Sequence, residues 1–303
     1  MSGLALQLAA LRKQAGAPAA TATSPTSIFP ASVYPASPSP IPDELRRLLG
    51  IRARTPARVP SADRGLPGIE VADGVRLLEQ FHRSDSQVGT IDSRFATTQH
   101  TRGFGVVPRA QLLHFDTETT GLAGGTGTRA FMIGAAGWTE GVLHVRQLFL
   151  TMMSGERAML ELFASWLDPE MVLVSYNGRS YDAPLLATRF RLARLANPLA
   201  GLRHLDLLYP VRRRFRRVWE NCRLATVERE WLDVVRDDDL PGSEAPRAWR
   251  DYLRGGSAHD LRRVLAHNER DLRSLDSLLV KLSEDREPLF APVEDPPAMP
   301  LTA

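Results

Sequence analysis

Residues 112–128 read LLHFDTETTGLAGGTGT, an apolar run that ends in two acidic residues and passes directly into a glycine-rich turn. The apolar run predicts a buried β-strand over residues 112–118. Because side chains alternate along a strand, Asp116 and Glu118 project from the same face, while Phe115 points into the core. Two carboxylates side by side at a strand end repel each other unless a cation neutralises them. The pattern therefore indicates a site for a hard divalent cation, Mg²⁺ or Mn²⁺, with a solvated acidic turn as the alternative.

Composition and charge set broad limits. The 303 residues are enough for one domain of about 200 residues and a looser extension. The 38 basic and 35 acidic residues leave a net charge of +3, so charge alone does not indicate a nucleic-acid partner. Cys222 is the only cysteine, which excludes an intrachain disulfide and favours a reducing compartment. Without a membrane-length apolar stretch or a signal-peptide pattern, we expect a cytoplasmic protein.

Composition also divides the chain into segments. The first carries almost no charge and has six prolines from Pro25 to Pro42, so it cannot bury enough apolar surface to order itself. A short helical pattern at 43–51 and a strand-like piece at 68–72 follow. We expect a disordered tail at 1–42, an N-terminal extension packed on the core at 43–109, the main domain at 110–284 and a proline-rich C-terminal tail at 285–303.

The main domain shows a regular pattern of apolar runs. Short turns separate the first three runs, which favours an antiparallel meander. Strands and helices then alternate, which indicates parallel strands with helices on the faces of the sheet. We expect Ser154 to cap the first of these helices. The fold class is α/β, with strands at 112–118, 130–138, 142–150, 171–175 and 202–207, helices at 154–167, 182–195 and 259–282, and further helical structure after Tyr209.

Two more polar segments fall where a sheet of this kind places its site. SYNGRSYD, at 175–182, joins a buried strand to a helix. Asp182 begins that helix, near the positive end of its dipole; the alternative is a simple capping aspartate that needs no metal. AHNERD, at 266–271, lies on the last helix, where His267 and Asp271 share a face. The alternative here is a solvated helix face.

Taken in order, these segments resemble the three exonuclease motifs of the DEDD superfamily. FDTETTGL resembles the first motif, the Asn-x-x-x-Tyr-Asp pattern the second, and the terminal helix the third. The chain is still more similar to one branch, the YprB-type ribonuclease H-like proteins, which are predicted exonucleases. The stretches that carry this resemblance are FDTETTGLAGGTGTRAFMIG, LVSYNGRSYDAPLLATRF, HLDLLYP, NCRLATVE, RDDDLPG and HNERDLRSL. The resemblance implies a ribonuclease H-like fold over about residues 110–282.

The resemblance also implies a role for four carboxylates. Asp116 and Glu118 match the first motif, Asp182 the second and Asp271 the third. Such sites hold two Mg²⁺ or Mn²⁺ ions about 3.5–4 Å apart, one activating water and the other stabilising the leaving 3′ oxygen. Asp116 would bridge both ions. The implied activity is 3′→5′ exonuclease cleavage of single-stranded DNA or RNA.

The glycine-rich turn and the second motif indicate how a strand end is held. Glycines after Glu118 allow backbone N–H groups to approach the terminal nucleotide. The turn lacks the lysine pattern of a Walker loop. The residues that we expect at the substrate are Thr119, Gly121, Leu122, Asn177, Tyr181 and Asn268.

The third motif departs from the family pattern. One DEDD subclass has a histidine five positions before the last aspartate, and another has a tyrosine four positions before it. Here His267 lies four positions before Asp271. A histidine suits a general base that deprotonates water, but because its register differs, Asn268 is an equal candidate for orienting the water. Asp206, at the end of another strand, is expected to be structural.

Arginines surround Phe215, and Trp219 follows closely. This combination can hold the phosphates of a single strand and stack its bases; an arginine-rich surface helix is an equal alternative. The acidic run at 237–239 would repel a phosphate backbone, so we expect a solvated turn there. The candidates for backbone contacts are Arg212, Arg213, Arg216 and Arg217.

Three functions agree with these residues. The first is a metal-dependent 3′→5′ exonuclease, the second a non-catalytic nucleic-acid-binding module with the same fold, and the third a structure-selective endonuclease. The presence of all four acids favours catalysis over a module that has lost it. Both DNA and RNA stay open as substrates, because no residue identifies a contact to the 2′-hydroxyl.

Overall fold

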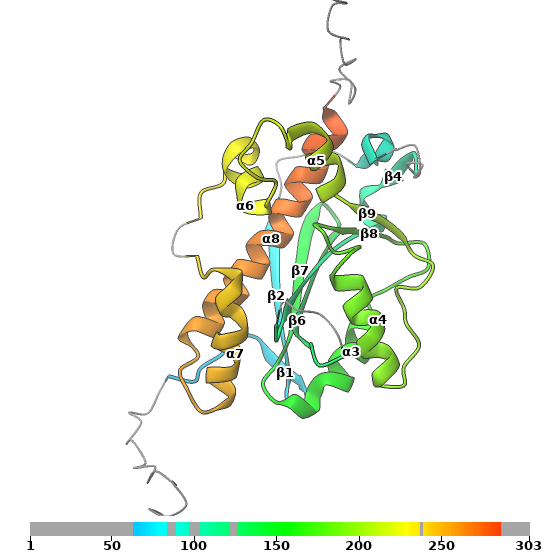
Figure 1. Cartoon of the computed structure of the whole chain (residues 1–303). Helices are drawn as coiled ribbons and strands as arrows, with labels where there is room; N and C mark the ends of the chain where they lie inside the picture. Colours follow the sequence, from blue (N-terminus) through cyan, green and yellow to red (C-terminus); the bar gives the residue numbers. More distant parts are fainter. Residues whose placement is uncertain (1–62, 84–88, 97–103, 122–125, 237–238, 286–303) are drawn as a thin grey trace, which may run out of the picture. The chain divides into compact units, whose positions relative to one another are not determined.

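The computed structural model describes residues 63–83, 89–96, 104–121, 126–236 and 239–285 (Figure 1). The chain divides into two units, Met1–Arg58 and Val59–Ala303. The whole first unit, and with it the predicted tail and the helix at 43–51, lies outside the described residues. So does the predicted C-terminal tail, except for Asp285.

Seven of the described strands form one mixed sheet in the order β1-β2-β7-β6-β5-β8-β9. Strands β1, β2, β7, β6 and β5 pair antiparallel, and β8 and β9 continue the sheet in parallel with β5. The predicted fold class is therefore confirmed. The strands are β1 (Ile69–Ala72), β2 (Val75–Arg83), β5 (Leu112–Thr119), β6 (Ala130–Thr139), β7 (Val142–Leu150), β8 (Val172–Ser175) and β9 (Arg203–Asp206), beside a separate ribbon of β3 (Thr90–Asp92) and β4 (Val106–Pro108).

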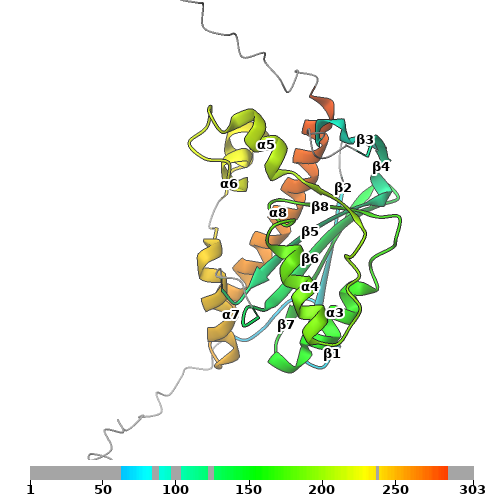
Figure 2. The ribbon, with the colours of Figure 1, turned by 45° about the vertical axis from the view of Figure 1, so that its right-hand side comes forward.

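Helices cover both faces of the sheet. Helices α3 and α4 lie on one face and the long helix α8 runs along the other (Figure 2). None of the described helices combines the length and the apolar character needed to cross a bilayer. The helices are α3 (Glu156–Ala164), α4 (Asp182–Leu192), α5 (Leu208–Phe215), α6 (Leu224–Val227), α7 (Ala245–Leu253) and α8 (His259–Glu284), with short 3-10 turns at Ser93–Ala96, Arg109–Gln111, Met153–Gly155 and Gly242–Glu244 and a π-helical turn at Glu228–Leu232.

The structure differs from two of the sequence-based expectations. Strands β1 and β2 are members of the main sheet, and β2 pairs with β7 along its whole length, whereas the sequence predicted an extension packed on the core. The residues of β2 are mostly half-buried without strict alternation, which hides the strand from a pattern search. Ser154 does not cap a helix: it lies in a 3-10 turn, and α3 begins after Gly155 without a side-chain cap.

Strand β5 lies where the antiparallel part of the sheet meets the parallel part. Phe115 belongs to one buried cluster, with residues of α3 and α4, and Leu112 to another, with residues of α8. The pairing of β5 with β8 ends at His114. The carboxyl end of β5 therefore extends past β8, into the position where open α/β sheets carry their sites.

A glycine in β6 lets α8 approach the sheet closely. Asp116, Gly134 and Gln147 are direct neighbours across β5, β6 and β7, so they stand in one row on one face. A Cβ atom on Gly134 would lie only 2.1 Å from Oδ1 of Asn268 and 2.9 Å from Cδ1 of Leu272, both on α8. Because Gly134 has no side chain, Asn268 can occupy this space.

We expect Gly134→Ala to lower the free energy of unfolding by about 1–3 kcal/mol, because the added methyl group overpacks this contact. Gly137→Ala is the matched control on the same strand, since its Cβ would meet nothing closer than 3.6 Å. Removing glycine there should be neutral or stabilise by about 0.4–1 kcal/mol. Urea denaturation measures both, and equal effects of the two changes would contradict the close approach of α8.

Candidate functional site

The four predicted carboxylates converge from three elements: Asp116 and Glu118 from β5, Asp182 from α4 and Asp271 from α8. Burial raises the pKa of Asp116 well above its ordinary value, and the charges of Asp182 and Asp271 raise it further. Burial likewise raises the pKa of Glu118, and the other three carboxylates add to the shift. The four acids are therefore close enough to destabilise one another's charged forms.

Asp116 is held by a buried amide. Nδ2 of Asn268 donates to Oδ2 of Asp116 at 2.8 Å, and Oδ1 of Asn268 accepts from Nε2 of Gln147 at 2.9 Å. Because Gln147 also donates to the carbonyl oxygen of Leu265, the orientation of both amides is defined. Asn268 is 0% exposed, so it lies beneath the site rather than at the substrate, and we interpret it as a residue that positions Asp116.

Asp182 is the first residue of α4, not its cap, because Tyr181 occupies the cap position. The hydroxyl of Thr117 donates to Oδ1 of Asp182, which joins the helix to β5. Burial raises the pKa of Asp182 to about 6, although this hydrogen bond favours the ionised form. Gly178 provides room for the carboxylate, since a Cβ there would lie 2.6 Å from Ser175 and 3.1 Å from Asp182.

Asp206 fixes the loop that leads to Asp182. Its carboxylate accepts hydrogen bonds from the backbone N–H groups of Asn177 at 2.8 Å, Arg179 at 3.0 Å and Leu208 at 3.1 Å. Asn177 has a positive φ of 68°, a conformation that asparagine tolerates better than most residues. These contacts give Asp206 a structural role, as the sequence suggested.

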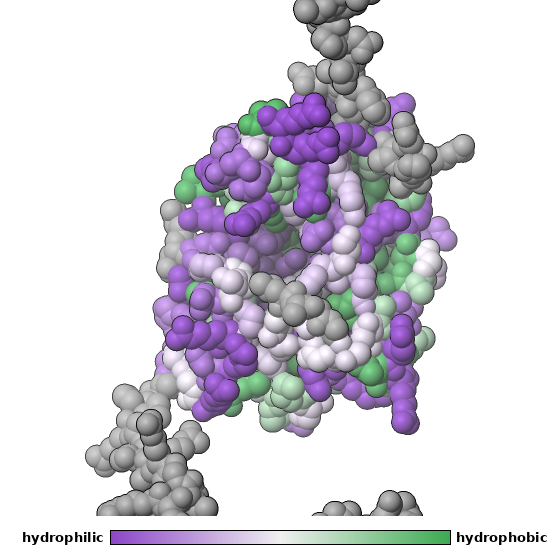
Figure 3. All heavy atoms as spheres, in the orientation of Figure 1, coloured by the Kyte–Doolittle hydropathy of each residue, from purple (hydrophilic) through white to green (hydrophobic). Residues whose placement is uncertain are grey.

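Three of the residues that we expected at the substrate contact one another at the end of β5. The hydroxyl of Tyr181 donates to the carbonyl oxygen of Gly121 at 2.9 Å and lies 3.3 Å from Oγ1 of Thr119. Asn177 is exposed on the neighbouring loop. Leu122 lies outside the described residues. On the face shown in Figure 3, hydrophilic residues are widespread, with residues of intermediate hydropathy and smaller hydrophobic patches between them.

His267 and Asp271 share a face of α8, as predicted, and they meet a residue that we had not assigned to the site. Nδ1 of His267 lies 2.7 Å from Oδ1 of Asp239, and its Nε2 lies 3.6 Å from Oδ2 of Asp271. Asp239 was expected in a solvated turn, but its side chain is only 19% exposed. Burial alone would raise the pKa of Asp239, yet the hydrogen bonds from His267 and Arg236 lower it overall.

Arg236 connects this histidine to three acids. Its guanidinium donates to Asp271 at 2.6 Å, to Asp239 at 3.0 Å and to Glu228 at 2.8 Å. Glu228 is fully buried and also accepts from Ser274 at 2.6 Å. Sequence reasoning missed Arg236 and Glu228, although both lie in the NCRLATVE and RDDDLPG stretches that carry the family resemblance. Their spacing alone gave no sign that they converge on the last helix.

The arginines of α5 are only partly available as a nucleic-acid surface. Arg213 donates to the carbonyl oxygen of Phe95, which assigns it to internal packing. Phe215 stacks on Trp219 with a centroid distance of 3.8 Å, so these rings pack on each other. Arg212, Arg216 and Arg217 are exposed, and their predicted role stays a prediction.

The donor set suits a hard divalent cation. Among the described residues, no three His, Cys, Asp or Glu side chains stand close enough together to hold a metal ion. The chemistry of the cluster nevertheless fits, because buried carboxylate oxygens with raised pKa values gain most from a cation. Asp271 is the member of the cluster that the described structure pairs with an arginine.

We expect Asp182→Asn to raise the melting temperature of the metal-free protein at about pH 7 by 2–4 °C or more, the shift that about 1 kcal/mol produces in a domain of this size. The folded-state pKa is raised, to about 6 against 3.8, so the native state binds more protons between these values. Stability is therefore lost as the pH rises through this range, and the variant should lose its advantage near pH 4.

The measurement is thermal unfolding in EDTA as a function of pH. Asp251→Asn, at a side chain that is 54% exposed on α7, is the matched control and should leave the melting temperature unchanged. A lower melting temperature for Asp182→Asn at pH 7 would mean that the ionised carboxylate stabilises the fold, contrary to this account.

Comparison with known proteins gives the fold family that the sequence resemblance implied. The family model described as the RNase_H superfamily matches residues 113–283, more than half of the chain. The uncharacterised protein YprB of Bacillus subtilis (strain 168) is 38% identical over 174 residues, which are 57% of this chain and 42% of that protein. The chain thus spans less than half the length of this relative. The predicted resemblance to the YprB-type ribonuclease H-like proteins is confirmed.

More distant likenesses are found among solved structures. The family B DNA polymerase of Pyrobaculum calidifontis has a TM-score of 0.46 and 18% identity, over 60% of this chain and 26% of the polymerase. E. coli exonuclease I, solved in complex with a dT13 oligonucleotide, has a TM-score of 0.35 and 15% identity, over 54% and 45% of the two chains. Likenesses at this level carry no conclusion about activity. On the family match and its confirmed mixed sheet, the chain belongs to the RNase_H superfamily.

Proposed function

We propose that this chain is a metal-dependent nuclease that removes nucleotides from the 3′ end of single-stranded DNA or RNA. Membership of the RNase_H superfamily supports a nuclease-type function. The observation that carries the proposal is the convergence of Asp116, Glu118, Asp182 and Asp271: burial raises the pKa of each, and the neighbouring carboxylates raise the pKa values of Asp116 and Glu118 further. A cluster of four acids that has only one arginine partner among the described residues is costly to a fold, and divalent-cation binding is the function that most directly explains it.

These four carboxylates would hold two Mg²⁺ or Mn²⁺ ions. When bound, the ions supply Lewis-acid activation of water and stabilisation of the leaving 3′ oxygen. The chain itself orients the ligands: the amide of Asn268 fixes Asp116, and the hydroxyl of Thr117 fixes Asp182. Because these carboxylates are already held in place, they lose little conformational entropy when they bind an ion.

His267 has the contacts of a general base. Nδ1 of His267 lies 2.7 Å from a carboxylate oxygen of Asp239, which accepts, and 3.2 Å from Nη1 of Arg236, which donates; the shorter contact, with Asp239, favours a proton on Nδ1. The lone pair of the neutral ring then lies on Nε2, the nitrogen on the side of Asp271. We infer that Nε2 takes a proton from the attacking water, and that Asp239 holds the ring in the required orientation.

The end of β5 offers contacts for the terminal nucleotide. Thr119, Gly121 and Tyr181 form a small hydrogen-bonded group beside the acids, and Asn177 is exposed next to them. A hydroxyl pair of this kind can exchange its internal bonds for bonds to a sugar or phosphate. We propose that this group holds the 3′ end.

A second candidate is a nucleic-acid-binding module without catalysis. It is favoured by the ion pair between Arg236 and Asp271, because a guanidinium there neutralises one of the four acids without a metal. The first candidate predicts metal-dependent cleavage and the second predicts none. The cleavage assay below measures this difference.

We expect Asp116→Asn to reduce cleavage by at least about 1,000-fold, since the loss of a metal ligand removes several kcal/mol of transition-state stabilisation. The assay follows 5′-labelled single-stranded DNA and RNA with Mn²⁺, Mg²⁺ or EDTA. A ladder that shortens from the 3′ end, only with metal, is expected for wild type. Mn²⁺ should also raise the melting temperature of wild type but not that of the variant.

Asp251→Asn controls for an aspartate on the surface and should cleave as wild type does. Undiminished cleavage by Asp116→Asn would exclude the proposed centre. Internal cuts would indicate an endonuclease, and binding without cleavage by wild type would favour the second candidate.

We expect His267→Gln to lower kcat by about 10²–10⁴-fold, the usual contribution of a general base. Glutamine keeps a polar group near Asp239 but does not accept a proton from water. The rise of melting temperature with Mn²⁺ should stay, because the four carboxylates are unchanged. His144→Gln, on β7, is the control; if both variants keep kcat within about tenfold of wild type, His267 is not the base.

A further inference from the structure

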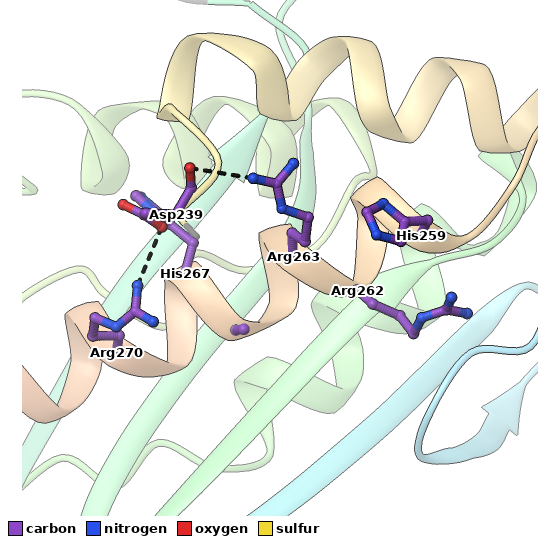
Figure 4. A pocket seen from close by; sticks show the side chains of 7 residues that line it. Asp239, His259, Arg262, Arg263, His267 and Arg270 are labelled. Carbon is purple, nitrogen blue, oxygen red and sulfur yellow. Dashed lines mark hydrogen bonds and ion pairs between the residues drawn. The ribbon is translucent and has the colours of Figure 1, made fainter. Parts of the chain in front are cut away.

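A pocket beside His267 is lined by three arginines and two histidines, with one aspartate and one alanine. Its volume is about 300 Å³, at the lower end of the range for ligand pockets. Figure 4 shows that most of its walls come from one face of α8 and that the loop residue Asp239 closes it. The lining residues are Asp239, His259, Arg262, Arg263, Ala266 and His267, together with Arg270.

Two of the arginines point toward the same place. Arg263 reaches the carbonyl oxygen of Asp239 at 3.4 Å, and Arg270 reaches its carboxylate at 3.2 Å (Figure 4). Their side chains are 26% and 27% exposed, so each keeps part of its surface open to solvent; Arg263 also lies 3.6 Å from the exposed carboxylate of Asp260. Arg262 instead donates to Asp63 and to the carbonyl oxygen of Gly65, which makes it part of the fold.

The carboxylate of Asp239 occupies the place of an anion in this pocket. It accepts from His267, Arg236 and Arg270, so it collects donors from two elements. Arg270 contacts the carboxylate of Asp239 and Arg263 contacts its backbone carbonyl oxygen, so both guanidinium groups face oxygen acceptors, as they would face the oxygens of a phosphate. A phosphate would exchange with the contacts of Arg270 and Arg263, the more exposed donors, and would leave the more buried pair of Asp239 and Arg236 in place.

His267 lies between the pocket and the acidic cluster. His267 lines the pocket, and its Nε2 lies 3.6 Å from Asp271. A strand whose last phosphodiester lies at the acids and that passes His267 therefore reaches Arg263 and Arg270. The acids repel phosphate, so a cationic pocket next to them is needed to hold the backbone.

We propose that this pocket binds a backbone phosphate of a single-stranded nucleic acid, through Arg263 and Arg270. The inference rests on the proposed function for its substrate class and names the contact that holds the strand. It differs from the surface on α5 that the sequence suggested, because there the aromatic rings pack on one another.

The test is the binding of a 5′-fluorescein-labelled oligothymidylate, followed by anisotropy in EDTA so that no cleavage occurs. The double variant Arg263→Gln/Arg270→Gln should weaken binding at least about tenfold, as expected for two lost charge-assisted contacts. The slope of log affinity against log salt concentration should fall by about 0.7, the value for one lost phosphate contact on a single strand.

Arg247→Gln is the matched control. Its side chain is 73% exposed on α7 and pairs with acidic neighbours, so affinity and salt slope should equal those of wild type. Unchanged affinity and slope in the double variant would overturn the proposal. The proposal would also be overturned if the double variant lost affinity for inorganic phosphate while its affinity for the oligonucleotide stayed unchanged. The pocket would then be a site for free anions.

Asp239→Asn is an independent variant, and its expected effect on oligonucleotide affinity is opposite to that of the double variant. Removing the internal anion should tighten oligonucleotide binding severalfold, and weaker binding would overturn the proposal. Circular dichroism and melting temperature establish that each variant is folded.

The cleavage assay of wild type separates this inference from the proposed function. Metal-dependent cleavage with unchanged binding by the double variant means that the pocket proposal fails alone. Loss of binding by the double variant, with no cleavage by wild type, supports the pocket and refutes the nuclease.

Discussion

One buried amide connects the last helix to the sheet at the point where the candidate site forms. Asn268 is fully buried and satisfies both ends of its side chain, on Asp116 and on Gln147. Leaving either group without a partner would cost about 1–3 kcal/mol, so the contact fixes both the height and the rotation of α8 on the sheet. It depends on Gly134, since any side chain there would fill the space. The positions of His267 and Asp271 follow from this one attachment.

The site itself works against the stability of the fold. Four acids are buried near one another, and each raises the energy of the others' ionised forms. The fold tolerates them because its neighbours supply donors: a threonine hydroxyl for Asp182, an amide for Asp116 and a guanidinium for Asp271. Functional sites commonly retain such destabilising arrangements, and a divalent cation would relieve this one.

Acidic side chains are also paired with donors on the outer side of α8. Arg236 holds three acids together, and Asp239 is shared between this network and the arginines of the cationic pocket. A single aspartate thus lies between the proposed metal site and the proposed phosphate pocket. A nuclease needs both within the length of one nucleotide or so, because its substrate carries the negative charge that its catalytic acids repel.

Local patterns in the sequence determined much of this protein. The apolar runs and turns predicted the meander, the parallel strands and α8, and the family resemblance selected the acids. These features depend on neighbours in the chain, so periodicity reveals them. Only the tertiary structure placed β2 in the sheet, buried Asn268 beneath Asp116, and brought Arg236 and Asp239 to His267. Those contacts join residues far apart in sequence, and their partners are chosen by packing and by the need to satisfy buried polar groups, which no local pattern records.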